Sequence, residues 1–206
     1  MTNEKLIALT FDDGPSNVTN DVLDILEKEQ IPATFFLIGE NIVPEYKDTL
    51  IRELNLNCEI ANHSFTHSDM TTLEPSVIKD EIEKTTALIK EYTNVDPRFF
   101  RPPYISVDDK MFDNISLPFI RGLGCNDWDF DYDAEYRIKT MLKAARDGLI
   151  YLLHDLTDNH PTVEALPVVI KELKKQGYKF VTLSDLFKLK NVDPNQKNKL
   201  WTNVFE

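Results

Sequence analysis

Short apolar runs alternate with amphipathic stretches along the whole 206-residue chain, and this alternation most limits how it can fold. The runs are brief and bounded by polar or turn-forming residues, which is typical of buried parallel strands. Repeated strand–helix units of this kind build a mainly parallel sheet. We predict seven strands, at residues 6–11, 34–38, 59–61, 98–100, 119–122, 150–153 and 180–182.

The stretches between these runs carry apolar residues on one helical face. We predict helices at residues 20–29, 76–92, 133–146 and 162–176. Pro161 in the first turn and Gly177 just past the end mark the start and stop of the last helix, and His160 is predicted to lie in the preceding loop. We therefore predict an α/β fold, a distorted (β/α) barrel with about seven parallel strands. An open doubly wound sheet is the second choice.

Length and composition predict one soluble domain spanning residues 1–206. The 35 Asp and Glu residues outnumber the 23 Lys and Arg residues, and the net charge of −12 disfavours nucleic acid and anionic membrane surfaces as partners. We expect no membrane span, because every apolar run is far shorter than roughly 18 residues. We also expect a monomer with two free thiols, Cys58 and Cys125. The apolar pattern in the last residues, 201–205, predicts packing against the outside of the domain.

Two adjacent carboxylates, Asp12 and Asp13, follow the first predicted strand, and Gly14-Pro15 then forces a turn. Consecutive side chains in an extended segment point apart, so one carboxylate can hold a metal ion while the other faces a substrate. The alternative is an Asp-rich turn that caps the next helix. In a barrel, residues at the carboxyl ends of the strands form the catalytic rim, so we expect the site there.

His63 and His67 follow the third predicted strand and are two of four histidines in the chain. Four residues apart, they share one face if the segment is helical, close enough to bind one cation. With Asp13 they supply three nitrogen and oxygen ligands, the number that a catalytic zinc-type site uses with one open position. A hydrogen-bonded structural histidine is the alternative for each residue.

Three further polar residues follow the later predicted strands. The Arg101 guanidinium can fork onto a carboxylate and hold it, or it can be a structural arginine that seals the barrel end. If Asp127 accepts a hydrogen bond from His154, it fixes the imidazole tautomer and raises its pKa, which suits a general acid. Trp128 and Leu152 are expected as apolar walls for an acyl group or a sugar, with core packing as the alternative for Trp128.

Five motifs of the chain, in this order and spacing, resemble the polysaccharide deacetylase family, also called the NodB-homology domain or carbohydrate esterase family 4. The stretch from His154 through Leu183 is similar to the last unit of the family, so the resemblance covers nearly the whole chain. The five motifs are Thr10–Pro15, Asn62–His67, Phe99–Tyr104, Asn126–Trp128 and Leu152–Asp155.

The resemblance implies a metal-dependent hydrolase that removes acetyl groups from a polysaccharide or oligosaccharide. The implied cofactor is one divalent cation, zinc ahead of cobalt or nickel. The roles that the resemblance implies are Asp12 as catalytic base, Asp13, His63 and His67 as metal ligands, Arg101 as the group that positions the base, the Tyr104 backbone N–H as part of the oxyanion hole, His154 as catalytic acid tuned by Asp127, and Trp128 and Leu152 as pocket-lining residues.

Family members often have glycine where Ile105 follows Tyr104 in this chain, and the fourth motif here is a bare Asn-Asp-Trp. Both features resemble the acetyl xylan esterase branch. The expected substrate is therefore the O-acetyl esters of xylan, with N-deacetylation of chitin or peptidoglycan N-acetylglucosamine as the alternative. A polymer substrate implies a secreted or cell-surface protein; residues 1–5 show no secretion pattern, which leaves a cytoplasmic location as the alternative.

Two functions of other classes compete with this interpretation. A glycoside hydrolase would use paired carboxylates without a metal ion, but it leaves the two histidines and Arg101 unexplained. A non-catalytic carbohydrate-binding domain would have inherited the fold and lost the chemistry. All the residues that the chemistry needs are present, which disfavours that alternative.

Overall fold

A computed structural model of the protein describes residues 4–206. Its strands are β1 (Lys5–Gly14), β2 (Thr34–Leu37), β3 (Glu59–Asn62), β4 (Phe119–Ile120), β5 (Leu123–Gly124), β6 (Leu149–His154), β7 (Tyr178–Phe180) and β8 (Leu200–Trp201). Its α-helices are α1 (Thr19–Glu29), α2 (Lys47–Asn55), α3 (Pro75–Thr93), α4 (Asp109–Asn114), α5 (Ala134–Ala144), α6 (His160–Lys175) and α7 (Leu183–Lys190).

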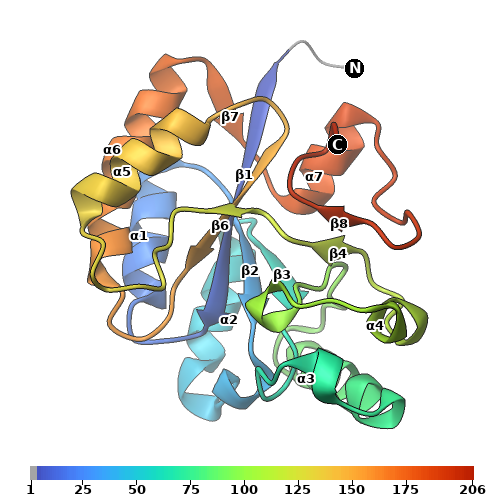
Figure 1. The fold of residues 1–206 in the computed structure, drawn as a ribbon. Coiled ribbons are helices and arrows are strands. Elements are labelled where there is room, and N and C mark those ends of the chain that lie inside the picture. Colours follow the sequence, from blue (N-terminus) through green and yellow to red (C-terminus); the bar gives the residue numbers. More distant parts are fainter. Residues whose placement is uncertain (1–3) are drawn as a thin grey trace.

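The strands are parallel and are arranged around β1, which lies at the centre of the molecule (Figure 1). The main sheet runs in the order β3-β2-β1-β6-β5, and β7 pairs with the first residues of β1. Isolated bridges from Asn62 to Phe100 and from Phe100 to Phe119 then connect β3 to the β4–β8 pair. Within residues 4–206 the hydrogen bonds do not close a complete ring. The predicted α/β fold with a mainly parallel sheet is confirmed.

The helices cover the sheet on its outer sides. Figure 1 shows α1, α5 and α6 together on one side of β1 and β6, with α7 on the opposite side near β8. The buried face of α6 carries Leu166, Val169 and Leu173, spaced three and four residues apart as an amphipathic helix requires. The helix begins at His160, so the prediction of a loop there is wrong. Pro161 occupies the first turn, where a missing backbone N–H costs no hydrogen bond.

The predicted strand at residues 98–100 is not a strand. Phe100 alone forms bridges there, since Pro97 and Pro102 remove backbone donors on both sides. The short strands β5 and β8, and the helices α2, α4 and α7, were not predicted, because their apolar patterns are too brief to stand out from their surroundings.

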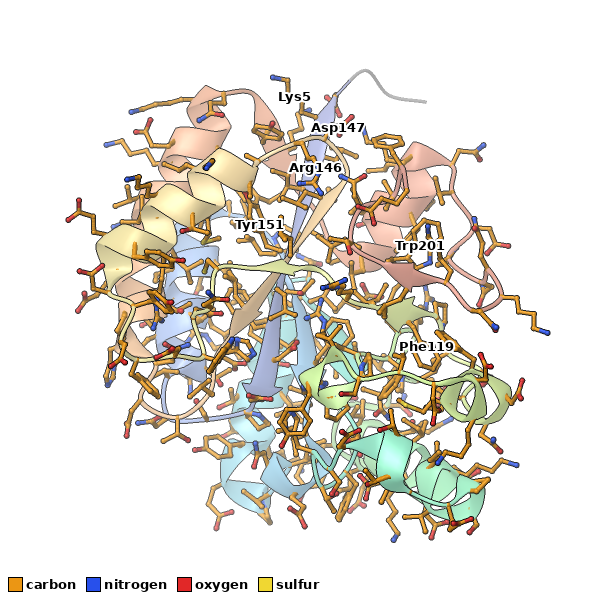
Figure 2. All side chains as sticks on the ribbon, in the orientation of Figure 1. Lys5, Phe119, Arg146, Asp147, Tyr151 and Trp201 are labelled. Atoms are coloured by element: carbon orange, nitrogen blue, oxygen red, sulfur yellow. The ribbon has the colours of Figure 1, made fainter. Side chains whose placement is uncertain are left out.

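The C-terminal residues also differ from expectation. Trp201 is 1 % exposed and lies within the core, its ring in edge contact with Phe187 at 5.2 Å between centroids. Its indole N–H donates to the Pro194 carbonyl at 3.0 Å. Figure 2 shows Trp201 near Phe119, on the two short strands that complete this side of the sheet. The prediction that these residues pack against the outside of the domain is therefore wrong for Trp201, which belongs to a buried strand paired with β4.

The amino-terminal end of β1 is tied down by one carboxylate. Asp147 accepts hydrogen bonds from the Leu6 backbone N–H and from the buried Lys190 ammonium, both at 2.7 Å. Figure 2 shows Asp147 beside Arg146 and close to Lys5, at the top of β1. These contacts hold the amino-terminal end of β1 in place.

Both cysteines, Cys58 and Cys125, are buried free thiols, as predicted. None of the helices in residues 4–206 combines the length and the apolar content that crossing a bilayer requires.

Glu53 on α2 is fully buried, and neither of its carboxylate oxygens has a hydrogen-bond partner within residues 4–206. Burial raises the pKa of this carboxyl well above its usual range, and the charge of Asp155 adds to the increase. The group therefore holds a proton in the folded protein at pH values where the unfolded chain has released it. Such a group makes stability fall as the pH rises above its unfolded pKa.

We expect Glu53→Leu to raise the free energy of unfolding by about 1–3 kcal/mol, because it replaces an unpartnered buried polar group with an apolar one. The gain should be larger at pH 8 than at pH 5. Urea unfolding at the two pH values measures it, with the exposed Glu91→Leu as the control that changes little. A loss of stability at both pH values would contradict this account.

Candidate active site

The two carboxylates at the end of β1 approach the same histidine. The pairing of β1 with β2 shifts register between Asp12 and Gly14, and Asp13 has a φ of 72°. This bulge turns Asp13 out of the regular alternation of a strand. Asp13 Oδ1 lies 3.4 Å from His63 Nε2, and Asp12 Oδ2 lies 3.7 Å from the same atom. The expectation that the two side chains point apart is therefore wrong.

His63 and His67 come together through a turn rather than a helix. The Asn62 side chain accepts from the Ser64 N–H at 2.9 Å, and the Ser64 hydroxyl accepts from the His67 N–H at 3.1 Å. Both Ser64 and His67 have positive φ. The two imidazole rings lie 4.9 Å apart between centroids, so the predicted proximity holds although the helical geometry does not.

Glu81 on α3 holds this turn and was not predicted as a site residue. Its carboxylate accepts from the Phe65 N–H at 2.9 Å and from the Thr66 N–H at 2.8 Å. An acidic residue on the buried side of an otherwise amphipathic helix was the sequence feature that could have identified it. Glu81 therefore fixes the backbone between the two histidines.

Asp13, His63 and His67 each offer one ligand atom, and these three atoms lie within 4.8 Å of one another. His63 Nδ1 donates to the Arg101 carbonyl at 2.7 Å, which leaves the Nε2 lone pair directed at the cluster. Asp13 Oδ1 is buried and has no hydrogen-bond partner among residues 4–206, which is a costly state for a carboxylate oxygen. Two imidazoles and a carboxylate oxygen suit a divalent cation such as zinc, and the three residues fit one.

The electrostatics of the cluster favour an ionised Asp13. Burial by itself raises the pKa of Asp13, but His63, together with the charges of His154 and His67, outweighs burial and lowers it to about 2. The carboxylate is therefore available as a ligand throughout the neutral range.

Arg101 lies beneath Asp12 and holds it in place. Its Nη1 donates to Asp12 Oδ1 at 2.5 Å, and both side chains are buried. The guanidinium stacks on the Phe36 ring at 4.2 Å from its centroid, and Nε donates to the Ile120 carbonyl at 3.3 Å. These contacts fix one oxygen of Asp12 and leave Oδ2 on the side of His63.

Asp127 holds His154 from two sides. Its Oδ1 lies 2.9 Å from His154 Nδ1, and its Oδ2 accepts from the His154 backbone N–H at 2.8 Å. Burial lowers the pKa of His154, but the charge and hydrogen bond of Asp127, with help from Asp12 and Asp13, raise it to about 9. The ring therefore carries a proton at neutral pH, with Nε2 free to deliver it.

A buried arginine on α5 supports this pair and was not predicted. Arg137 donates to Asn159 Oδ1 at 2.5 Å and to Thr162 Oγ1 at 2.7 Å. Thr162 in turn donates to Asp127 Oδ2 at 2.9 Å, and Asn159 donates to the His154 carbonyl at 2.8 Å. Arg137 thus holds Asp127 in place through Thr162, and holds the His154 backbone in place through Asn159.

A cleft of about 750 Å³ opens over these groups. Trp128, 58 % exposed, and the half-buried Leu152 line it, so Trp128 is not core. Tyr104 and Ile105 both have a φ of 57°, and the Tyr104 N–H has no acceptor within residues 4–206. All the predicted site residues except Arg101 line the cleft, and Arg101 contacts Asp12, which does. The predicted residues that line the cleft are Asp12, Asp13, His63, His67, Tyr104, Asp127, Trp128, Leu152 and His154.

Comparison with known proteins gives consistent matches. Residues 1–117 match the family model described as polysaccharide deacetylase. A bifunctional xylanase/deacetylase of Pseudobutyrivibrio xylanivorans is 52 % identical over 202 residues, which cover 98 % of this chain and 34 % of that protein. This chain thus spans about a third of the length of that relative.

Two solved structures are similar to this fold throughout. One is the Xyl-CE4 domain of a multidomain xylanase from the hindgut metagenome of Trinervitermes trinervoides, with a TM-score of 0.97 and 50 % identity over 98 % of this chain and 99 % of that one. The other is a family 4 acetyl xylan esterase from Clostridium thermocellum in complex with a cobalt ion, with a TM-score of 0.93 and 43 % identity over 97 % and 99 %.

We expect Asp127→Asn to lower the pKa of His154 by at least about one unit from its value near 9, because the variant loses the charge that opposes burial. NMR titration of the His154 ring in metal-free protein measures the shift. Thr162→Val, which removes one donor to Asp127 but keeps its charge, is the matched control and should shift the pKa less. An unchanged titration in the Asn variant would contradict the assigned cause.

Proposed function

Because the chain belongs to the polysaccharide deacetylase family, we propose that it is a metal-dependent hydrolase that removes O-acetyl groups from xylan. The observation that carries the proposal is the cluster of Asp13, His63 and His67, whose ligand atoms lie within 4.8 Å of one another beside Asp12. The names of the similar proteins, a xylanase/deacetylase and an acetyl xylan esterase, support xylan as the polymer.

Asp13, His63 and His67 would hold the cation. When bound, a divalent cation supplies Lewis acidity that makes water more acidic and polarises a carbonyl. Zinc is the first candidate for these ligands, with cobalt or nickel as alternatives.

Asp12 acts as the base in this proposal. Arg101 fixes its Oδ1, so Oδ2 is the oxygen that accepts a proton from the attacking water. Attack on the acetyl carbonyl places negative charge on its oxygen. The unused Tyr104 N–H, held in the cleft by the left-handed backbone at Tyr104 and Ile105, donates a hydrogen bond to that oxygen.

His154 acts as the acid. A sugar alkoxide is a strong base and leaves only when protonated, and the raised pKa of His154 keeps a proton available on its ring at neutral pH. Asp127 keeps the ring oriented and compensates its charge. Trp128 and Leu152 provide apolar surfaces for the sugar face and the acetyl methyl group.

We further propose that the protein acts outside the cytoplasm, secreted or at the cell surface, where an acetylated polymer is accessible. A monomer is sufficient for this chemistry, because every group invoked lines one cleft of one chain or, in the case of Arg101, contacts a residue that lines it.

The protein should release acetate from acetylated xylan faster than from chitooligosaccharides or peptidoglycan, and a chelator should remove the activity until zinc or cobalt is restored. Acetate and reducing ends are measured in parallel on the three substrates. Reducing ends without acetate would favour a glycoside hydrolase instead. Binding to the polymer without acetate release by zinc-loaded protein would favour a non-catalytic domain, and full activity after exhaustive chelation would end the metal proposal.

The division of labour between the two carboxylates is tested with Asp12→Asn and His63→Ala. The Asn variant should keep about one zinc per chain and lose turnover by roughly 10²- to 10⁴-fold, the usual contribution of a general base. The Ala variant should lose both zinc and turnover. Zinc content by atomic absorption and acetate release are measured on protein whose folding is verified by circular dichroism, since Asp12→Asn leaves Arg101 without its anion. Near-native turnover in the Asn variant would assign the base elsewhere.

A further inference from the structure

Arg121 lies directly after β4 and lines the cleft. Its side chain is exposed and makes no hydrogen bond or ion pair within residues 4–206. Its backbone is fixed, however. The N–H groups of Arg121 and Gly122 both donate to the Trp201 carbonyl, at 2.8 and 3.0 Å. An unpartnered guanidinium therefore projects from an anchored segment of chain.

This segment packs against Leu152 in the wall of the cleft and against Arg101. A Cβ atom at Gly122 would lie 2.9 Å from Arg101 Nη2 and 3.0 Å from Leu152 Cβ. The chain at Gly122 thus contacts both the residue that holds Asp12 and one of the apolar walls. Arg121, one residue away, is placed to contact a sugar close to the one that carries the acetyl group.

Arg121 is a cationic side chain in a cleft whose other charged lining residues are carboxylates and histidines. The carboxylates that line it are Asp12, Asp13 and Asp127, and Arg121 is the one arginine or lysine among its lining residues. Asp12 is paired with Arg101, Asp127 contacts His154, and Asp13 contacts the two histidines. None of them pairs with Arg121, although the chain has a net charge of −12. A neutral polymer would leave that guanidinium without an opposite charge.

We propose that Arg121 binds a carboxylate carried by the substrate, and that the substrate is an acetylated xylan with uronic acid branches. A guanidinium binds a carboxylate through two parallel hydrogen bonds, which gives direction as well as charge. The inference rests on the proposed deacetylase function and specifies its substrate. Peptidoglycan fragments also carry carboxylates on their lactyl and peptide groups, so the same chemistry has a second source that the experiment must separate.

The test compares two forms of one substrate. Acetylated xylo-oligosaccharides with a glucuronic acid branch are assayed beside the same oligosaccharides whose branch carries a neutral hydroxymethyl group in place of the carboxyl group. The wild-type enzyme should have a kcat/KM on the order of fivefold higher for the acidic form, expressed mainly in KM, as for an exposed charge pair. The preference should shrink as salt is raised.

Arg121→Gln should make the two forms equal substrates. Arg98→Gln is the matched control, an exposed arginine outside the cleft lining, and it should keep the full preference. Equal acetate release from both forms by the wild-type enzyme would overturn the inference and leave the deacetylase proposal standing. A preference that survives Arg121→Gln would also overturn it. Absence of acetate release from every saccharide would instead contradict the proposed function itself.

A third substrate separates the two sources of carboxylate. Peptidoglycan fragments that carry free carboxylates are assayed under the same conditions. Activity on them that exceeds activity on the xylan series, and that falls in Arg121→Gln, would overturn the uronic acid assignment. Weak activity, little changed by Arg121→Gln, would support it.

Discussion

The site depends on one buried arginine, Arg101, which contacts both Asp12 and His63. The Arg101 side chain binds Asp12 at 2.5 Å, and its backbone carbonyl accepts from His63 Nδ1 at 2.7 Å. The same residue therefore orients the proposed base and fixes the tautomer of a proposed ligand. Removing one partner of such a buried pair typically costs about 3–5 kcal/mol, because the other charge is left uncompensated. Phe36, whose ring lies under the guanidinium, adds a packing contact that restricts where Arg101 can sit.

Much of the fold and of the site could be predicted from the sequence because both follow from strand ends. Buried parallel strands are short apolar runs, and their carboxyl ends meet at one edge of the sheet, so polar residues that follow such runs converge. Asp12 near the end of β1 and His154 at the end of β6 are adjacent in the paired register, which explains why residues 142 positions apart share one cleft. The resemblance of the motifs to a known family supplied the roles that spacing alone left open.

The remaining features depend on contacts that a linear pattern does not contain. The bulge at Asp13 has a left-handed backbone whose carbonyl accepts a hydrogen bond from the Asn41 side chain. The turn between His63 and His67 also contains left-handed residues and is held by the Asn62 and Glu81 side chains. Arg137 acts through Asn159 and Thr162, so its role becomes visible only when three elements are packed together. The polar composition before Trp201 concealed the strand β8, whose formation depends on pairing with β4 rather than on its own propensity.

The central claim is that one carboxylate and two imidazoles bind a cation while the neighbouring carboxylate, held by Arg101, remains free. X-ray absorption spectroscopy of protein loaded with one equivalent of zinc tests it most directly. The account predicts two imidazole rings per zinc ion within a shell of nitrogen and oxygen atoms at about 2.0–2.1 Å. A spectrum with no imidazole scattering, or with a single ring, would contradict it.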